Sequence, residues 1–188
     1  MKGYPMTKHF WPRFILGSLA LLLAGSAAAD YLINPGDLLL VSVWKEQDLS
    51  MEALVRPDGK FSFPLAGDID AAGHSVEEVR QSLVKKIEGF IPDVVATVMI
   101  KSQEGNKAFV VGKVTRPGPI LMTAETNVMQ ALSIAGGTAQ FAAIKKIKIL
   151  RGQGKNQTAI PFNYDDVEDG EKLEQNVTLQ PGDVVVVP

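Results

Sequence analysis

The chain has 188 residues and no cysteine, and its 19 basic and 21 acidic side chains give a formal net charge of −2. Without cysteine there can be no disulfide framework, no thiolate metal site, no cysteine nucleophile and no lipid attached to a cysteine. The basic residues show no clustered excess, which excludes a typical nucleic-acid-binding protein.

Residues 1–29 are predicted to be a cleavable secretory signal. The leader is basic, and the apolar run FILGSLALLL at 14–23 is too short to be a membrane-spanning anchor. Ala27 and Ala29 are then spaced as an A-x-A signal, which predicts cleavage between Ala29 and Asp30. A short buried helix is the alternative interpretation. The signal predicts that the mature protein works outside the cytoplasm.

The first half of the mature chain is expected to consist of strands around one helix. Residues 38–44 (LLLVSVW) predict a buried strand, with Trp44 in the core. Residues 55–61 (VRPDGKF) predict two strands joined by a turn. Residues 75–87 predict a helix, because a Ser-x-x-Glu capping box precedes apolar residues at helical spacing. Residues 94–100 predict the next strand.

The second half follows a polar stretch at 101–106, which is the expected domain boundary. We expect Thr126 to cap a second helix that ends at a Gly-Gly pair. Two strands flank the rigid turn TRPGP, and two more bracket a GQG hairpin turn. Because each half sets one helix among several strands, the predicted fold class is α+β. The strands are expected at 108–114, 120–122, 146–150, 158–162 and 184–187.

One four-residue pattern occurs twice. NPGD at 34–37 leads into the first strand, and QPGD at 180–183 leads into the last. In both, the proline fixes φ, the glycine can take an unusual backbone angle, and the aspartate can accept hydrogen bonds from nearby amides. We therefore interpret Asp37 and Asp183 as parts of tight structural turns, in preference to catalytic groups.

Short motifs in the first half occur in the order of a known family. They are YLINPGD at 31–37, VRPDG at 55–59, FPLAG at 63–67 and AGHS at 72–75. Together they resemble the polysaccharide biosynthesis/export domain of the outer-membrane polysaccharide export proteins of Gram-negative bacteria. The resemblance implies a strand-rich domain with one helix over residues 30–104.

Motifs in the second half are similar to a soluble-ligand-binding β-grasp (SLBB) domain, which the resemblance places over residues 105–188. They are VVGKV at 110–114, RPG at 116–118, ALSIAGG at 131–137 and LQPGD at 179–183. The resemblance assigns structural roles, and no catalytic, cofactor or metal role, to the turn residues of both halves. These are Pro35, Gly36, Asp37, Arg56, Pro57, Asp58, Gly59, Pro117, Gly118, Gly136, Gly137, Pro181, Gly182 and Asp183.

The resemblance implies a non-enzymatic component of the route by which capsule or exopolysaccharide leaves the cell. Family members assemble as rings around or beneath the path of the polymer. Longer members carry a lipidated cysteine and a C-terminal amphipathic helix that crosses the outer membrane, whereas this chain has no cysteine and ends at Pro188. It therefore resembles a short periplasmic class, free or peripheral to the outer membrane. Its implied partners are the polysaccharide, an inner-membrane copolymerase and synthesis complex, and a separate outer-membrane β-barrel.

Two other functions remain open. The first is a monomeric periplasmic module that binds carbohydrate or peptidoglycan, in which Tyr31 and Trp44 could stack on sugars. The second is a glycoside hydrolase or lyase, since Asp68 and Asp70 have the spacing to share one face of a strand. The acidic segment at 165–171 lacks the spacing of a calcium loop and is interpreted as a solvated loop.

The remaining candidates are a histidine and a group of basic residues. His74 is the one histidine after residue 29, and a lone histidine supports neither a zinc site nor a catalytic triad. We expect it on a surface loop. One concentration of basic residues could meet acidic sugars, but a solvated edge strand is the preferred interpretation. Its members are Lys145, Lys146, Lys148, Arg151 and Lys155.

Overall fold

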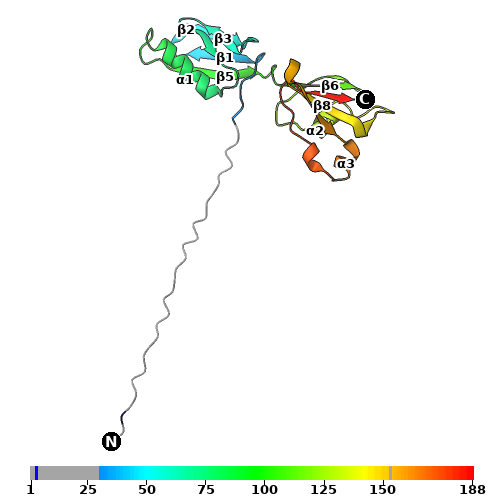
Figure 1. Cartoon of the computed structure of the whole chain (residues 1–188). Helices are drawn as coiled ribbons and strands as arrows, with labels where there is room; N and C mark the ends of the chain where they lie inside the picture. Colours follow the sequence, from blue (N-terminus) through cyan, green and yellow to red (C-terminus); the bar gives the residue numbers. More distant parts are fainter. Residues whose placement is uncertain (1–2, 4–29, 153) are drawn as a thin grey trace.

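The computed structural model describes Gly3, residues 30–152 and residues 154–188. The predicted signal peptide, apart from Gly3, lies outside the described residues, as does Gln153 in the hairpin turn. The described strands and helices form two units that follow one another along the chain and meet near residue 105 (Figure 1). Within these described ranges, no helix is both long enough and apolar enough to cross a membrane.

The first unit is built around β1 (Leu38–Val43), the central strand of a three-stranded sheet. β1 pairs antiparallel with β2 (Glu46–Leu54) on one side and with β5 (Ala96–Ser102) on the other. Buried and half-buried side chains alternate along β1, because successive residues of a strand point to opposite faces. A separate antiparallel hairpin of β3 (Lys60–Phe63) and β4 (Gly67–Asp70) completes the strands of this unit.

Helix α1 (Val76–Ile87) packs against the first unit, and the predicted helix is confirmed. Its capping box is formed as predicted. The Ser75 side chain accepts a hydrogen bond from the Glu78 backbone, and the Glu78 carboxylate accepts one from the Ser75 backbone at 2.7 Å. One face of the helix is buried in the core, through Val79, Leu83 and Ile87.

The second unit is a five-stranded sheet with the order β7-β6-β10-β8-β9. Its first and last strands, β6 and β10, lie side by side and parallel at the centre, so the two ends of this unit meet there. The remaining pairs are antiparallel, which confirms the two predicted hairpins. The strands are β6 (Lys107–Gly112), β7 (Gly118–Leu121), β8 (Ile147–Arg151), β9 (Thr158–Phe162) and β10 (Val184–Val187).

Helix α2 (Val128–Ile134) begins one residue later than the sequence suggested. Asn127 is the N-cap: its side chain accepts a hydrogen bond from the Gln130 backbone at 2.9 Å, and the Gln130 side chain bonds back to the Asn127 backbone. The prediction that Thr126 caps this helix is therefore wrong. The reciprocal Asn–Gln pair satisfies two backbone donors, whereas the Thr126 hydroxyl donates to a carbonyl two residues earlier.

The acidic segment at 165–171 was expected to be a loop, but it contains part of a third helix, α3 (Tyr164–Glu168). Val167 ties this short helix to the second unit, because its side chain is buried in that unit's core. Three short 3-10 turns complete the described elements: η1 (Ile144–Lys146), η2 (Gly154–Asn156) and η3 (Leu173–Gln175).

Trp44 is not in the core, so that prediction is wrong. It is 71% exposed, because it occupies a two-residue turn between β1 and β2 in which Val43 pairs directly with Glu46. Lys45, the other turn residue, has a φ of +66°, which closes the hairpin. The apolar run predicted the strand correctly, but its last residue lies beyond the end of the sheet.

Each unit has its own hydrophobic core, which confirms the α+β class. In the first unit the core lies between the inner residues of β1, the β3–β4 hairpin and α1; in the second, between the five-stranded sheet and α2. Among the fully buried large side chains are Leu39, Phe61, Ile69 and Leu83 in the first core and Leu132, Ile147, Ile149 and Phe162 in the second.

The central parallel pair depends on a glycine. Gly112, at the end of β6, has a φ of +97°, and a Cβ there would lie 2.0 Å from the carbonyl oxygen of Val187. We predict that Gly112→Ala lowers the free energy of unfolding by about 3 kcal/mol or more, because both a left-handed backbone and a steric clash are imposed. Urea denaturation followed by circular dichroism measures this loss.

Gly170→Ala is the matched control, because Gly170 has a φ of +80° but no atom within 4 Å of the point where a Cβ would lie. This substitution should cost only about 1–2 kcal/mol, the cost of the backbone conformation alone. Equal losses for the two variants would contradict the role assigned to the β6–β10 contact.

Candidate functional site

The NPGD turn at 34–37 immediately precedes β1 and is hydrogen-bonded to Val55, the residue that follows β2. Gly36 has a φ of +95°, which allows the chain to reverse, and the Asp37 backbone donates to the Asn34 carbonyl at 3.1 Å. Gly36 donates to the Val55 carbonyl at 2.8 Å, and the Val55 amide donates to the Asp37 carbonyl at 2.9 Å. The turn is therefore bonded into the sheet before β1 begins.

The Asp37 side chain is fully buried and accepts three hydrogen bonds. Oδ2 accepts from the Tyr31 hydroxyl at 2.7 Å and from the Asn34 amide at 2.9 Å. Oδ1 accepts from the backbone amide of Gly105 at 2.9 Å, 68 residues along the chain. Burial and the hydrogen bond to Asp37 raise the pKa of Tyr31, so the phenol remains a neutral donor. We call these four residues the Asp37 clamp.

Gly105 lies against the NPGD turn so closely that no side chain fits. A Cβ at this position would lie 2.3 Å from the carbonyl oxygen of Pro35 and 2.9 Å from Asp37 Oδ1. Its φ is outside the left-handed region, so the need for glycine comes from space and not from backbone conformation. The clamp thus fixes the linker between the two units to the first unit.

The QPGD turn at 180–183 repeats this geometry in the second unit. Gly182 has a φ of +88°, and Asp183 Oδ2 accepts from the Gln180 amide at 2.8 Å. Here the remaining partner is a cation: the Arg151 guanidinium donates to the Asp183 carboxylate at 2.7–3.1 Å. Asp183 is buried and Arg151 is half-buried, and their ion pair ties β8 to the start of β10.

The RPG and AGG motifs come together at the end of α2. The Thr115 hydroxyl donates to the Gly136 carbonyl at 2.9 Å, and the Arg116 guanidinium donates to the Ile134 carbonyl at 3.0 Å. These bonds satisfy carbonyl groups that a helix leaves unpaired at its C-terminus. Pro117 directly precedes β7, which begins at Gly118, and Gly136 and Gly137 have φ values of +82° and +80°.

The RPDG turn forms an exposed ion-pair cluster. Gly59, with a φ of +81°, follows Pro57 and Asp58 in the turn, and Arg56 lies within 2.9 Å of both Asp58 and Asp68. Hydrogen bonds from Arg56 lower the pKa of Asp58 and lower that of Asp68 to about 2. The cluster joins the RPDG turn to β4.

The carboxylates of Asp68 and Asp70 lie on one face of β4, but each has its own cation. Asp70 pairs with Lys60 at 3.0 Å, and this contact lowers the pKa of Asp70, as Arg56 lowers that of Asp68. A glycosidase needs one carboxyl group with a raised pKa to act as the acid. The environment of this pair is thus opposite to the one that acid catalysis requires.

The other candidate residues also have ordinary contacts. His74 is exposed, as expected, with Nδ1 3.2 Å from the Ala72 carbonyl. In the acidic segment, Asp165 pairs with Lys145 at 3.1 Å and Asp166 with Lys172 at 2.7 Å. Across residues 30–152 and 154–188, no group of three or more histidine and carboxylate side chains is placed to hold a metal ion.

The basic concentration is not on an edge strand, so that expectation is wrong. β8 lies between β10 and β9 in the interior of the sheet, and Lys148 projects from its exposed side. Arg151 is bound to Asp183, and Lys145 pairs with Asp165. The residues that are close in sequence therefore have separate structural environments.

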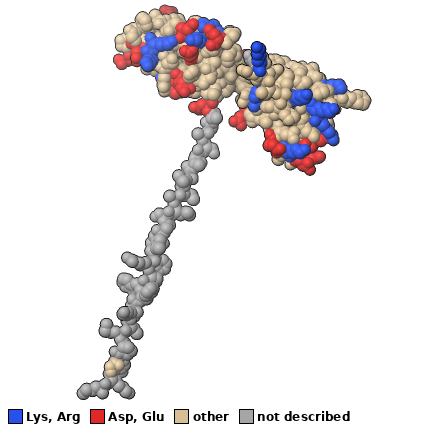
Figure 2. Space-filling view, in the orientation of Figure 1, with Lys and Arg blue, Asp and Glu red and all other residues tan. Residues whose placement is uncertain are grey.

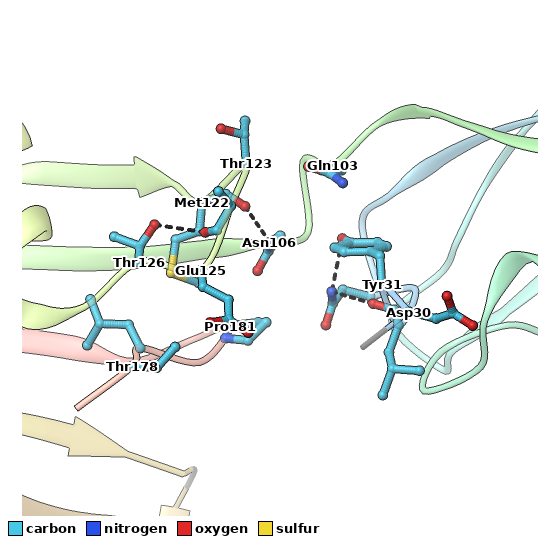
Figure 3. Close-up of a pocket in the computed structure, with 14 residues that line it drawn as sticks. Asp30, Tyr31, Gln103, Asn106, Met122, Thr123, Glu125, Thr126, Thr178 and Pro181 are labelled. Atoms are coloured by element: carbon cyan, nitrogen blue, oxygen red, sulfur yellow. Dashed lines mark hydrogen bonds between the residues drawn. The ribbon is translucent and has the colours of Figure 1, made fainter. Parts of the chain in front are cut away.

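A cleft of about 490 Å³ lies beside the Asp37 clamp, where the two units meet (Figure 3). Tyr31 of the first unit lines one side, and the loop at 122–126 lines the other. Asn34 of the first unit is also part of the lining. Gln103 and Asn106 of the linker lie between them. The described residues that line the cleft are Asp30, Tyr31, Leu32, Asn34, Gln103, Asn106, Met122, Thr123, Ala124, Glu125, Thr126, Thr178, Leu179 and Pro181.

Sequence reasoning did not find the clamp or the cleft. It singled out Asp37, but nothing local indicates that its partner is Gly105, because the two are 68 residues apart. The glycine within the polar boundary segment is a usable signal in retrospect, since an isolated glycine can mark a close backbone approach. The cleft has no sequence motif, because its walls come from both units.

The comparisons with known proteins agree with this architecture. Residues 25–101 match the family model described as polysaccharide biosynthesis/export protein, and residues 106–187 match the model of the SLBB domain. The two matches meet at the linker that holds Gly105. Each half of the chain therefore matches the domain that its motifs resemble, an export domain followed by an SLBB domain, and this confirms the family resemblance.

Two curated relatives are similar over much of the chain. The EPS I polysaccharide export outer membrane protein EpsA of Ralstonia nicotianae is 25% identical over 185 residues, covering 85% of this chain and 48% of that protein. The protein of the same name from Ralstonia solanacearum is 25% identical over 150 residues, covering 66% of this chain and 40% of its own length. The chain thus spans about half the length, or less, of the curated relatives it matches.

The clamp predicts a specific effect of adding one methyl group to the linker. Gly105→Ala should displace the linker from the NPGD turn, because the new Cβ has no room beside Pro35 and Asp37. We expect faster proteolysis within residues 101–106 and a larger radius of gyration in solution scattering. The circular dichroism spectrum should change little, since neither core contains Gly105.

Gly89→Ala is the matched control, because Gly89 also lies outside the left-handed region and has no atom within 4 Å of a Cβ. It should leave proteolysis and scattering unchanged. If Gly105→Ala behaves in the same way as this control, the clamp does not determine the arrangement of the two units.

Proposed function

We propose that this chain is a periplasmic component of a Gram-negative machinery that exports capsule or exopolysaccharide, and that it forms or gates part of the passage for the polymer. The observation that carries the proposal is the succession of an export domain and an SLBB domain along one chain. The relatives named as polysaccharide export proteins support it. The predicted signal at 1–29, cleaved between Ala29 and Asp30, supports release into the periplasm without a lipid anchor.

The proposed mechanism is physical, with no catalytic step and no cofactor. The acidic pair on β4 supports this, because both carboxyl groups have lowered pKa values and cationic partners. The Asp37 clamp supports a mechanical role, since it fixes the linker between the export domain and the SLBB domain. Two domains held in this way can line a polar passage between an inner-membrane copolymerase and synthesis complex and an outer-membrane β-barrel.

A homo-oligomeric ring is part of the proposal, and an apolar sheet face supports it. On the side of the five-stranded sheet that faces away from α2, Phe109 and Val111 are 41% and 37% exposed. Phe109 lies in register with Val184 of β10, which in turn lies opposite Leu150 of β8. A row of apolar side chains across several strands usually makes contact with another surface. A neighbouring copy in a ring would cover it.

The alternative is a monomeric periplasmic module that binds carbohydrate or peptidoglycan without conducting polymer. The cleft between the two domains favours this function, because its volume is in the range of small-molecule sites. The two functions differ in assembly and in the effect of deleting the gene.

Deletion of the gene tests the export proposal. We expect surface polysaccharide to be lost and polymer to be retained inside the cell, because synthesis would continue while the passage is incomplete. Immunostaining of intact and permeabilised cells locates the polymer. The full chain supplied from a plasmid should restore export. Normal surface polysaccharide in the deletion strain would overturn the proposal.

The ring is tested by changing the apolar face. Native mass spectrometry of the mature protein should show an oligomer for the wild type and a shift towards monomer for Phe109→Glu, because the new charge would be buried in the interface. Phe141→Glu is the control, because Phe141 is 84% exposed on a loop outside the sheet. This variant should assemble as the wild type does. A wild type that is monomeric at all concentrations, or a Phe109→Glu variant that assembles fully, would contradict the ring.

A further inference from the structure

The cleft between the domains presents neutral hydrogen-bonding groups from both sides (Figure 3). The side-chain amide nitrogens of Asn34 and Asn106 donate to protein oxygens, while their Oδ1 atoms make no hydrogen bond to any described residue. The side-chain amide of Gln103 and the hydroxyl groups of Thr123 and Thr178 also line the cleft, and they make no side-chain hydrogen bond to any described residue. The cleft therefore offers several acceptors and donors to a ligand rich in hydroxyl groups.

An aromatic ring and apolar groups complete this lining. The hydroxyl group of Tyr31 is held by Asp37 and Asn34, so the orientation of its ring is fixed before any ligand arrives. Leu32, which is 52% exposed, and Pro181 add apolar surface. A pyranose ring has polar edges and apolar C–H faces. The hydrogen-bonding groups of the cleft can bind its edges, and the Tyr31 ring can pack against one of its faces.

The charges around the cleft restrict the kind of sugar. Among the described residues of the lining, Asp30 and Glu125 carry the acidic side chains, and none is a lysine or arginine. Cleavage after Ala29 would place an amino group on Asp30, which would balance that carboxylate and leave Glu125 uncompensated. A carboxylated sugar would be repelled by this site, whereas a neutral or amine-bearing sugar would not.

We propose that the cleft binds a segment of neutral or amino-bearing saccharide, which contacts the export domain through Tyr31 and Asn34 and the SLBB domain through Thr123 and Glu125. This inference rests on the proposed export function, because it assigns the cleft to the exported polymer or its fragments. A bound segment bridges the two domains, so its occupancy stabilises the arrangement that the Asp37 clamp holds.

The test uses three defined oligosaccharides with the mature full chain. Isothermal titration calorimetry and backbone amide chemical shifts would be recorded with cellohexaose, a chitosan hexamer and a hexagalacturonate. We expect the neutral and amine-bearing hexamers to bind and to shift amides of Tyr31, Asn106 and Thr123. The hexagalacturonate should bind at least about tenfold more weakly because of Glu125.

Charge reversal separates the cleft from the rest of the surface. Glu125 is exposed, so Glu125→Lys should fold normally; it should weaken chitosan hexamer binding by about tenfold and strengthen hexagalacturonate binding. Glu168→Lys makes the same charge change on exposed α3, outside the cleft lining, and should leave all three affinities unchanged.

The inference is overturned if none of the three hexamers shifts the cleft amides at millimolar concentration. It is also overturned if hexagalacturonate binds the wild type most tightly, or if Glu125→Lys and Glu168→Lys have the same effect. Its failure is distinguishable from failure of the export function. If the chain exports polymer but has no saccharide site, deletion of the gene would still abolish export, and the Glu125→Lys variant supplied from a plasmid would restore it fully. If the chain has no export function, deletion of the gene would leave surface polysaccharide normal, whether or not the hexamers bind.

Discussion

The buried carboxylate of Asp37 ties the turn before β1 to the linker between the two domains. A carboxylate removed from water must have its lone pairs satisfied, and here the Tyr31 hydroxyl and the Asn34 and Gly105 amides do so. Two of these donors are local and close the turn before β1. The third belongs to the linker, so the interaction that shapes a four-residue turn also holds the connection to the SLBB domain, and both walls of the cleft lie beside it.

The second copy of the turn shows how one local pattern serves different tertiary contacts. Asp37 and Asp183 each accept a hydrogen bond from the residue three positions earlier and are each buried. Asp37 is otherwise bound to neutral donors, one of them across the domain boundary. Asp183 is bound to Arg151, within its own domain. The charge-assisted Arg151–Asp183 pair stabilises contacts within the SLBB sheet. The linker between the domains instead depends on a neutral hydrogen bond from the Gly105 amide to Asp37, so it is sensitive to the position of that one amide.

These features connect the fold to the proposed export function. The proposed passage would require subunits whose domains keep a defined orientation, and the clamp holds the linker between the domains against the export domain. On the face shown in Figure 2, acidic and basic side chains lie on both domains. The lining of the cleft includes none of Phe109, Val111, Leu150 and Val184 of the apolar face, so the proposed saccharide contact and the proposed contact with a neighbouring copy use different residues.

The sequence by itself determined the features that depend on neighbouring residues. The capping box of α1, the hairpin of β8 and β9, the α+β class and the family all follow from patterns within a few residues or from their order. The predictions that Trp44 lies in the core and that the basic residues lie on an edge strand were wrong, because exposure depends on where a strand ends and which strands flank it. Tertiary structure alone decided the contact of Asp37 with Gly105 and the cleft beside it, since both form only when segments 68 residues apart are brought together.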